Sequence, residues 1–353
     1  MTTLTDLISY TCEHFSLRSA SVQTLNAMIF SAIASGNVYQ VSLARYVPSK
    51  TPEASLRRVE RFFQKKTLLF SEYAPMTTQL LNFKGKFELC LDRTNWKFGK
   101  KNINYLVLSW RINSHISIPL FAKELDKAGN SDTQERIDLL EEFNHVFGYD
   151  RIGLLLADRE FVGEKWFTQL IKSKISFSIR VKENTLIPYG KKPISISNLF
   201  KHLKQGEKRV ILKEMYNAIV EFAGTRTKDG ELVIVMSNQS LGAAKILAQY
   251  RHRWSIEEMF KKLKTSGFNF ENTHMKNSNR LLTLLIIVSI AALLIYLIGV
   301  IRKTKWKKTV GCPLWSVFKR GMIYLQTILA QNLQEAACIL LKTMQQAQYF
   351  FAE

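Results

Sequence analysis

Cysteine is scarce in this chain, with four residues among 353, and none of them forms the CxxC pair of a zinc site. The wide separation of Cys12, Cys90, Cys312 and Cys338 fits reduced thiols better than a disulfide framework. The first residues also lack the basic and apolar stretches of a secretory signal. We therefore expect a protein of the reducing cytoplasm.

Acidic residues are few relative to basic ones. The chain has 50 Lys and Arg against 29 Asp and Glu, which leaves a formal net charge of +21. A surplus of this size indicates a polyanionic partner, either nucleic acid or an acidic membrane face, and charge alone does not distinguish the two.

Long apolar runs are absent apart from Leu281 to Ile301, which has no charged residue and is followed by Arg302 and Lys303. Its length and flanks meet the criteria for a membrane-spanning helix. The alternative is a helix that is buried on all sides in a protein core. We favour the buried helix, and expect no membrane association, because the run stands alone and follows a polar stretch.

The N-terminal part reads as short helices. Thr5 or Asp6 is a candidate cap for the first, and a later segment has apolar residues at helical spacing. These apolar residues are Leu25, Met28, Ile29 and Ile33.

Basic residues then cluster around Phe62 and Phe63, which suits contacts with DNA phosphates, although a solvated charged face on an ordinary helix is an open alternative. The cluster comprises Arg45, Lys50, Arg57, Arg58, Arg61, Lys65 and Lys66.

Strand patterns begin near Phe83. Three short β-prone runs are followed by a helix, for which the stretch from Ser131 to Gln134 offers a capping box and Gly148 a stop. The uninterrupted apolar run Ile152 to Ala157 is typical of a parallel strand covered on both faces. A further helix and strand follow. The order of three strands, helix, strand, helix and strand predicts an α/β protein with a ribonuclease H-like mixed sheet.

Residues 182–239 contain three further strand-like runs around Asp229 and Gly230, which we interpret as a β-rich insertion. The tail alternates basic residues with Trp306, Trp315 and Phe318, and then runs amphipathically from Leu325 to Phe350. The predicted regions are 1–82 (helical, basic, DNA-binding), 83–181 (first part of the catalytic domain), 182–239 (insertion), 240–301 (remainder of the catalytic domain) and 302–353 (helical C-terminal region).

Two aspartates occupy matching places, because Asp92 follows the apolar run that ends at Leu91 and Asp158 follows the run that ends at Ala157. Ligands of open α/β sheets bind at the carboxyl ends of strands. Two such carboxylates on neighbouring strands would repel each other unless cations neutralise them, and Mg²⁺ or Mn²⁺ suits oxygen ligands. The alternative is that each aspartate caps a turn or pairs with Arg93 or Arg159.

A third acid lies on a predicted helix from Ser240 to Gly267. Tyr250, Arg253, Glu257 and Lys264 fall within an arc of roughly 60° on an ideal α-helix. The flanking arc is apolar and would anchor the helix to a core. A solvated face is again the alternative.

Three segments resemble the signature regions of bacterial insertion-sequence transposases of the DDE class that carry a Tyr-x2-Arg-x3-Glu-x6-Lys signature. They are Asp92-Arg-Thr-Asn-Trp96, Leu-Leu-Ala-Asp158-Arg-Glu160-Phe and the run from Tyr250 to Lys264.

The resemblance implies that Asp92, Asp158 and Glu257 are catalytic and bind two divalent cations, Mg²⁺ or Mn²⁺. It implies that Tyr250, Arg253 and Lys264 contact transposon-end DNA. Trp254 is a further candidate for DNA binding, by stacking on an unpaired base, with core packing as the alternative. His252 is expected to be structural or a phosphate contact, because no second His or Cys lies at ligand spacing.

The expected function is therefore metal-dependent cleavage and strand transfer of an insertion sequence. The expected partners are double-stranded DNA, as terminal inverted repeats and target, and a second copy of the chain in a synaptic homodimer. A bacterial, nucleoid-associated location follows. Two alternatives are a ribonuclease H-like nuclease without strand transfer and an inactive DNA-binding derivative of a transposase.

Overall fold

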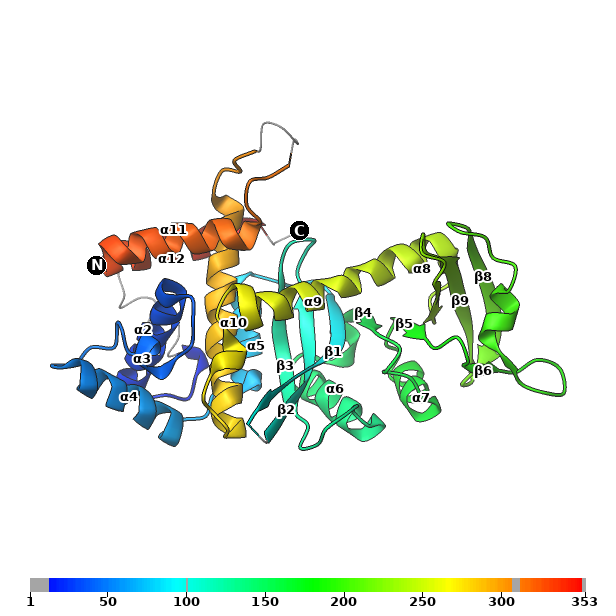
Figure 1. Cartoon of the computed structure of the whole chain (residues 1–353), viewed down its shortest axis with the longest axis horizontal. Helices are drawn as coiled ribbons and strands as arrows, with labels where there is room; N and C mark the ends of the chain where they lie inside the picture. The colour runs from blue at the N-terminus through cyan, green and yellow to red at the C-terminus, as the bar shows by residue number, and fades with distance from the viewer. Residues whose placement is uncertain (1–12, 100, 307–311, 351–353) are drawn as a thin grey trace.

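One mixed sheet organises the computed structural model, which describes residues 13–99, 101–306 and 312–350 (Figure 1). The sheet has eight strands in the order β3-β2-β1-β4-β5-β10-β9-β8. Strands β1, β4 and β5 are parallel to one another, and the remaining neighbours are antiparallel. The strands are β1 (Phe87–Phe98), β2 (Lys101–Arg111), β3 (Ser117–Glu124), β4 (Ile152–Ala157), β5 (Phe177–Val181), β8 (Lys208–Met215), β9 (Ala218–Arg226) and β10 (Leu232–Ser237).

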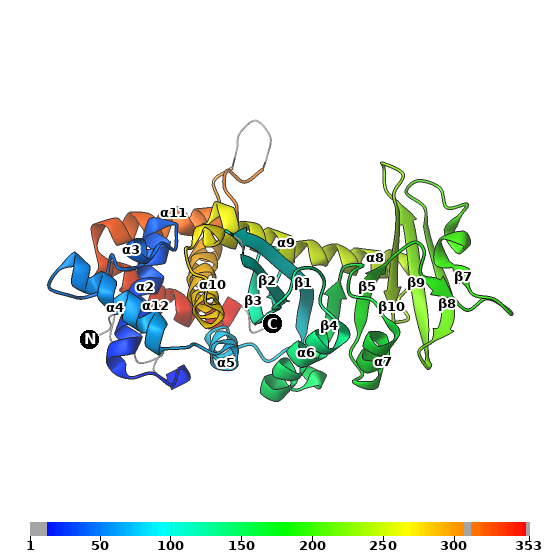
Figure 2. The ribbon, with the colours of Figure 1, turned by 60° about the horizontal axis from the view of Figure 1, so that its bottom comes forward.

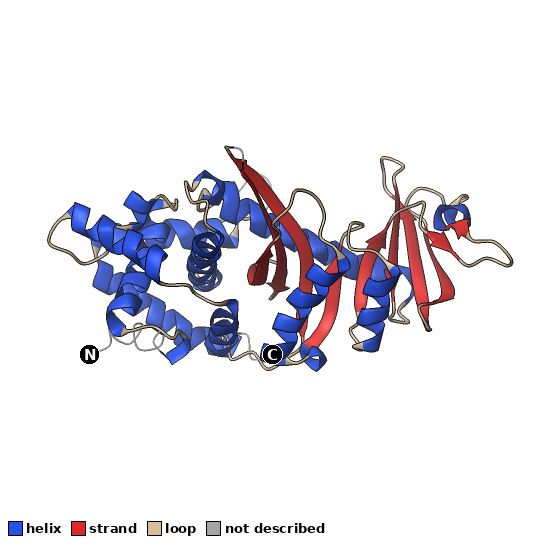
Figure 3. Cartoon of the chain, turned by 90° about the horizontal axis from the view of Figure 1, so that it is seen from below, coloured by secondary structure: helices blue, strands red, loops and turns tan. Residues whose placement is uncertain are grey.

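The helices α6 (Thr133–Phe147) and α7 (Glu164–Lys172) connect the parallel strands, so the predicted order of three strands, helix, strand, helix and strand is confirmed. The predicted mixed α/β class is also confirmed. Figure 3 shows α6 and α7 on the near side of the sheet. Strand β4 is almost wholly buried, as its apolar sequence predicts for a strand with neighbours and cover on both faces.

The capping box of α6 lies one residue later than predicted. Asp132 Oδ1 accepts a hydrogen bond from the Glu135 backbone N–H at 2.9 Å, and Glu135 Oε2 accepts one from the Asp132 N–H at 2.7 Å. Ser131 is buried instead, and its hydroxyl accepts a hydrogen bond from Arg136 Nε at 2.9 Å. Gly148 ends the helix as expected.

The strands of residues 182–239 continue the main sheet. Strand β10 pairs antiparallel with β5, and β9 and β8 extend the sheet outward from β10 (Figure 2). The short pair β6 (Leu186–Ile187) and β7 (Ile194–Ser195) forms a separate two-stranded sheet. The 3₁₀ turn from Ile196 to Phe200 follows it.

The predicted helix from Ser240 to Gly267 is present but not uniform. It consists of α8 (Gly242–Tyr250), a 3₁₀ turn (Arg251–Arg253), α9 (Trp254–Lys261) and a π-helical end (Lys262–Ser266) that stops at Gly267. Together these segments form one rod, residues 242–266. Figure 1 shows the rod crossing above the strands, from α10 at one end to β8 and β9 at the other.

Helix α10 (Ser278–Ile301) is the apolar run of the sequence. It is long and apolar enough to cross a membrane, yet 89% of its most apolar window is buried inside the protein. Its polar side chains are satisfied within the fold, because Thr283 Oγ1 accepts a hydrogen bond from the Leu68 N–H and Ser289 Oγ donates one to the Leu285 carbonyl. The structure thus favours the interpretation of this run as a core helix.

The N-terminal helices and the C-terminal helices pack together on α10 (Figures 1 and 3). The four apolar residues predicted for a helix face are buried in α2. The caps predicted at Thr5 and Asp6, like Cys12, lie outside the described residues. The helices are α2 (Ser19–Ser35), α3 (Gln40–Leu43), α4 (Pro52–Lys65), α5 (Phe70–Leu80), α11 (Val317–Gln331) and α12 (Leu333–Phe350).

The tail is broken into two helices at Asn332, whose side chain accepts hydrogen bonds from the backbone of Gln334 and Glu335 and so starts α12. Glycines allow α11 to approach α10 closely. A Cβ at Gly321 would lie 1.9 Å from the Ile295 carbonyl oxygen, so no side chain fits there.

Candidate active site

Asp92 and Asp158 lie side by side at the point where β1 and β4 part. The parallel pairing of these strands ends at Leu91 and Ala157, and each aspartate is the next residue. For β4 this is the strand end, as predicted. For β1 the expectation is wrong, because β1 continues to Phe98 while paired with β2, and Asp92 itself lies opposite Val107. At Asp92 the neighbouring strand β4 has ended, which leaves room for the Asp92 side chain.

Each aspartate is held by the next peptide group. The Arg93 N–H donates to Asp92 Oδ1 and the Arg159 N–H donates to Asp158 Oδ1, both at 2.7 Å. The guanidinium of Arg93 pairs with Glu160 at 3.3 Å instead of with Asp92. The alternative in which Asp92 serves mainly as an ion-pair partner of Arg93 is therefore wrong.

The rod that contains α8 and α9 presents two of its polar side chains, Tyr250 and Arg253, to these aspartates. The Tyr250 hydroxyl donates to Asp158 Oδ1 at 3.3 Å. Arg253 donates to Asp92 Oδ2 at 3.2 Å and also to Glu257 Oε1. Tyr250 and Arg253 of the predicted stripe thus face the sheet, whereas Glu257 is 36% exposed and reaches the site only through Arg253.

Lys264 leaves the stripe because the last turn is π-helical. Its ammonium group donates to the Asn95 carbonyl at 3.3 Å, pairs with Glu271 at 2.6 Å, and lies over the Trp96 ring. It therefore contacts the part of β1 beyond Asp92, next to the site but not among the acids.

Arg253 is the electrostatic centre of the site. Its side chain is 11% exposed and contacts both Asp92 and Glu257. Burial alone would lower the pKa of its guanidinium, but Tyr250, Glu257 and the two aspartates raise it. The group is permanently charged and neutralises the acids around it.

Burial also dominates at Asp92. It raises the pKa of the Asp92 carboxyl to about 6, against the lowering effects of the Arg93 N–H and of Arg253, while Glu160 and Asp158 raise it further. Burial likewise raises the pKa of the Tyr250 hydroxyl, which keeps it protonated as a donor. A carboxyl with a raised pKa beside a second carboxyl is a typical feature of a functional site.

The three predicted catalytic acids are not equally close. Asp92 and Asp158 are neighbours, whereas Glu257 is linked to Asp92 through Arg253. Among the described residues, no group of three His, Cys, Asp or Glu side chains is close enough to hold a metal ion as the side chains stand.

Trp254 is 59% exposed, so the core-packing alternative is wrong for this residue. His252 Nδ1 lies 2.8 Å from Glu88 Oε1, and Arg111 contacts the same carboxylate at 3.2 Å. His252 thus has a structural partner on β1, consistent with the interpretation that it is no metal ligand.

A supporting network around Glu160 was not predicted. Glu160 holds Arg93, and Arg93 also donates to Asn104 and Asn130. The Glu160 carbonyl accepts from Arg136, which fixes the turn after Asp158. Its position two residues after Asp158 is the one sequence signal that pointed to it.

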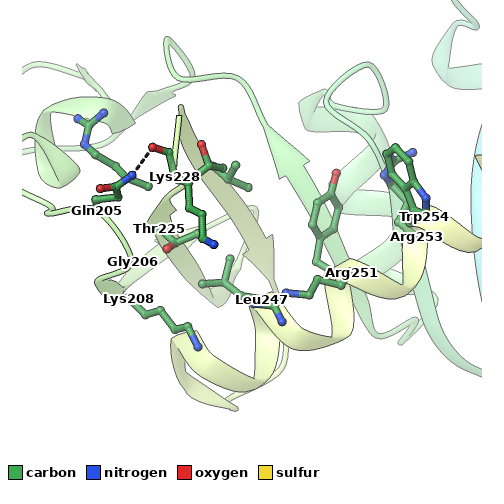
Figure 4. A pocket seen from close by; sticks show the side chains of 13 residues that line it. Gln205, Gly206, Lys208, Thr225, Lys228, Leu247, Arg251, Arg253 and Trp254 are labelled. Carbon is green, nitrogen blue, oxygen red and sulfur yellow. Dashed lines mark hydrogen bonds between the residues drawn. The ribbon is translucent and has the colours of Figure 1, made fainter. Parts of the chain in front are cut away.

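A pocket of about 1070 Å³ between the rod and the insertion strands was also not predicted. Figure 4 shows Lys208, Thr225 and Lys228 on one side and Arg251 and Trp254 on the other. Tyr250 and Arg253 line it as well, so it opens next to the acids. Its walls come from turns far apart in the sequence, which no local pattern connects.

Two neighbouring aspartates, with an arginine of a separate helix that joins one of them to a glutamate, agree with the class of DDE transposases. A family model described as "Transposase DDE domain" matches residues 89–294, a span that includes all three acids, and the chain belongs to this family. No curated protein matches the chain.

Among solved structures, the chain is similar to a piggyBac transposase synaptic complex with hairpin DNA, solved by cryo-EM. The TM-score is 0.50 at 8% sequence identity, and the match covers 95% of this chain and 72% of that one. At this identity the likeness concerns the fold alone.

Proposed function

We propose that this DDE transposase cuts and joins DNA at Asp92, Asp158 and Glu257, as the mobile element's own enzyme of the bacterial insertion-sequence type. The observation that carries the proposal is that the two aspartates lie together where β1 and β4 part, and that Arg253 of the facing rod joins Asp92 to Glu257. We interpret residues 83–181 and 240–301 as a ribonuclease H-like catalytic domain with residues 182–239 inserted.

The donor set fits two divalent cations, Mg²⁺ or Mn²⁺. Carboxylate oxygens are the ligands that these hard ions prefer, and Arg253 supplies one positive charge to Asp92, Asp158 and Glu257, which leaves negative charge for cations to balance. Asp92, Asp158 and Glu257 would hold the ions. When bound, the ions would activate a water or a DNA 3′-hydroxyl and stabilise the leaving oxygen of an in-line displacement at phosphorus.

Around this centre the chain's own residues bind and orient the DNA. Arg253 has the planar donors for bidentate contact with a phosphate, and Lys264 would act on a neighbouring phosphate as a point charge. Tyr250 orients Asp158 through its hydroxyl. Trp254, exposed beside the pocket of Figure 4, is placed to stack on an unpaired base.

The wider partners follow from the same proposal. The net charge of +21 suits double-stranded DNA, both terminal inverted repeats and target. Helix α4 belongs to the basic N-terminal region 1–82 and exposes Arg57, Arg61 and Lys65, which suits binding of the terminal repeats. We further propose a homodimer that pairs two ends, and a place in the bacterial cytoplasm on the nucleoid without membrane attachment.

The test is the variant Asp92→Asn, assayed with a labelled terminal-repeat duplex and with a pre-cut end in the presence of Mg²⁺. We expect loss of cleavage and joining with unchanged DNA affinity. The matched control is Asp150→Asn, the same change at an exposed aspartate that lies just before the first residue of β4. Near wild-type cleavage by Asp92→Asn would refute the role of Asp92. Cleavage without joined products from the wild type would support a nuclease instead.

A further inference from the structure

A second groove lies on the side of Trp254 that faces the C-terminal segment. Its volume is about 820 Å³, and its walls come from the end of β2 and the turn to β3, from α9, and from the chain between α10 and α11. Arg251 and Trp254 line both this groove and the pocket of Figure 4. The described residues of the chain between α10 and α11 that line the groove are Thr304, Trp306, Pro313, Trp315 and Ser316 (Figures 1 and 2 show α9, α10 and α11 around them). A strand that leaves the active site past Trp254 would enter this groove.

The groove carries an excess of positive charge. Of the described residues that line it, Glu258 is the sole acid, against four Lys and Arg. Arg111 pairs with Glu88 and Lys262 lies 3.9 Å from Glu258, so the excess rests on Arg251 and Arg320. Arg251 is exposed and has no ion pair or hydrogen bond from its guanidinium within the described chain. Arg320 donates to the Gly299 carbonyl at 2.9 and 2.6 Å, which fixes its position without cancelling its charge. The four cations are Arg111, Arg251, Lys262 and Arg320.

Two large exposed indoles line the same groove. Trp254 is 59% exposed and Trp306 is 62% exposed, and neither ring stacks on another ring in the described chain. Trp315 lines the groove as well. Phe318, from the same stretch of sequence, is buried and packs edge-on against Tyr296, so it belongs to the core.

Exposed aromatic rings among cations are what a single nucleic-acid strand requires. Bases inside a duplex already stack on one another, whereas an unpaired base gains about 1–3 kcal/mol by stacking on an aromatic side chain. Cations contact the phosphates of such a strand. Trp and Arg are enriched in protein interfaces too, so a second protein copy is the alternative occupant that the sedimentation measurement below tests.

The backbone holds Trp306 in place at the groove. Trp306 forms a bridge with Pro313, and the Leu314 N–H donates to the Lys305 carbonyl at 2.7 Å, so the two described stretches of the chain between α10 and α11 are joined. The close contact of Gly321 with α10 anchors the second stretch. The indole is therefore presented by a defined backbone.

We propose that this groove binds an unpaired stretch of a DNA strand, with Trp254 and Trp306 stacking on its bases and Arg251 and Arg320 contacting its phosphates. The proposal rests on the proposed function, because a strand opened at the Asp92 site would supply the ligand. It extends the proposed DNA contacts beyond the matched family residues, since Trp306 and Arg320 both lie beyond residue 294.

The test measures binding of fluorescein-labelled oligo(dT) to the full chain by fluorescence anisotropy. We expect Trp306→Ala to weaken this binding about tenfold, and Trp306→Phe to retain most of it, because a phenyl ring still stacks. Affinity for a terminal-repeat duplex should be unchanged. The matched control is Tyr189→Ala, which removes an aromatic side chain of similar exposure that lies in the loop between β6 and β7 and does not line the groove.

Wild-type affinity for oligo(dT) in Trp306→Ala would overturn the proposal, and so would an equal loss in Tyr189→Ala. A fall in self-association of Trp306→Ala, seen by sedimentation with oligo(dT) binding intact, would assign the groove to a second protein copy and also overturn it. A photo-crosslink from 5-iodouracil in the oligonucleotide should fall on Trp306 or Trp254.

These readouts do not depend on catalysis. If the wild type bound oligo(dT) through Trp306 but cut no terminal-repeat DNA, the proposed function would fail while the groove assignment held. If it cut and joined DNA normally but bound oligo(dT) independently of Trp306, the reverse would hold.

Discussion

Two arginines of one 3₁₀ turn have opposite surroundings. Arg253 is 11% exposed and paired with two acids, whereas Arg251 is exposed and pairs with none in the described chain. With three residues per turn, positions two apart point about 120° apart, so one turn serves both a compensated site and an open surface. In this region charge compensation, and not charge itself, distinguishes the candidate catalytic centre from the proposed DNA-binding groove.

The largest loss of unfolding free energy is expected from Arg253→Ala. It leaves the mostly buried Asp92 without its counter-charge, and removal of one partner of a buried pair costs about 3 kcal/mol of unfolding free energy. Urea denaturation of the metal-free protein measures the loss. An unfolding free energy equal to that of the wild type would mean that Arg253 does not stabilise the acids.

The unfolding free energy should depend on pH through the Asp92 carboxyl. The pKa of this carboxyl in the folded protein, about 6, lies above its value in the unfolded chain. Its contribution to stability is therefore complete at low pH and is lost as the pH rises through about 6. Relative to Asp92→Asn, wild-type unfolding free energy should fall by about 2 kcal/mol between pH 4 and pH 7. Parallel curves for the two proteins would contradict the raised pKa.

A smaller effect is expected from Tyr250→Phe, which removes the hydroxyl that donates to Asp158 at 3.3 Å. One hydrogen bond of this kind contributes about 1 kcal/mol to unfolding free energy. Thermal or urea unfolding measures the change, and Tyr39→Phe is the control because Tyr39 is exposed. An equal change in both variants would show that the Asp158 contact adds nothing.

The smallest effect on stability is expected from Arg251→Ala, within about 0.5 kcal/mol, because this side chain is exposed. DNA binding should change instead, with the slope of log affinity against log salt reduced by about 1. Lys172→Ala, at the exposed end of α7 in the layer below the sheet, is the control. An unchanged slope for Arg251→Ala would remove Arg251 from the DNA-binding surface.

Much of the fold was predictable because its signals are local. The apolar run of β4 predicts a buried parallel strand, and two acids directly after two such runs predict that they meet at one edge of the sheet. Helical periodicity predicts that Tyr250, Arg253 and Glu257 lie on one face of the rod; Tyr250 and Arg253 do face the sheet, and Glu257 pairs with Arg253.

Other features depend on contacts that no local pattern encodes. The 3₁₀ turn at Arg251–Arg253 contains no Gly or Pro that would signal a break. Strand β1 continues past Asp92 because β2 pairs with it there. The polar residues after Leu91 gave no sign of this continuation in the sequence. The pairing of β10 with β5 and both grooves likewise bring together residues that are remote in sequence.

The N-terminal helices bury their apolar faces against helices from the end of the chain. Helix α2 packs on α10 and α11, Gln326 donates to the Ile33 carbonyl, and the Tyr46 hydroxyl donates to the Leu329 carbonyl. Such long-range closure slows folding and cannot occur during early synthesis. A nascent chain therefore cannot complete its basic N-terminal region until almost the whole polypeptide has left the ribosome, and a fragment cut after residue 82 would expose the apolar face of α2 to water.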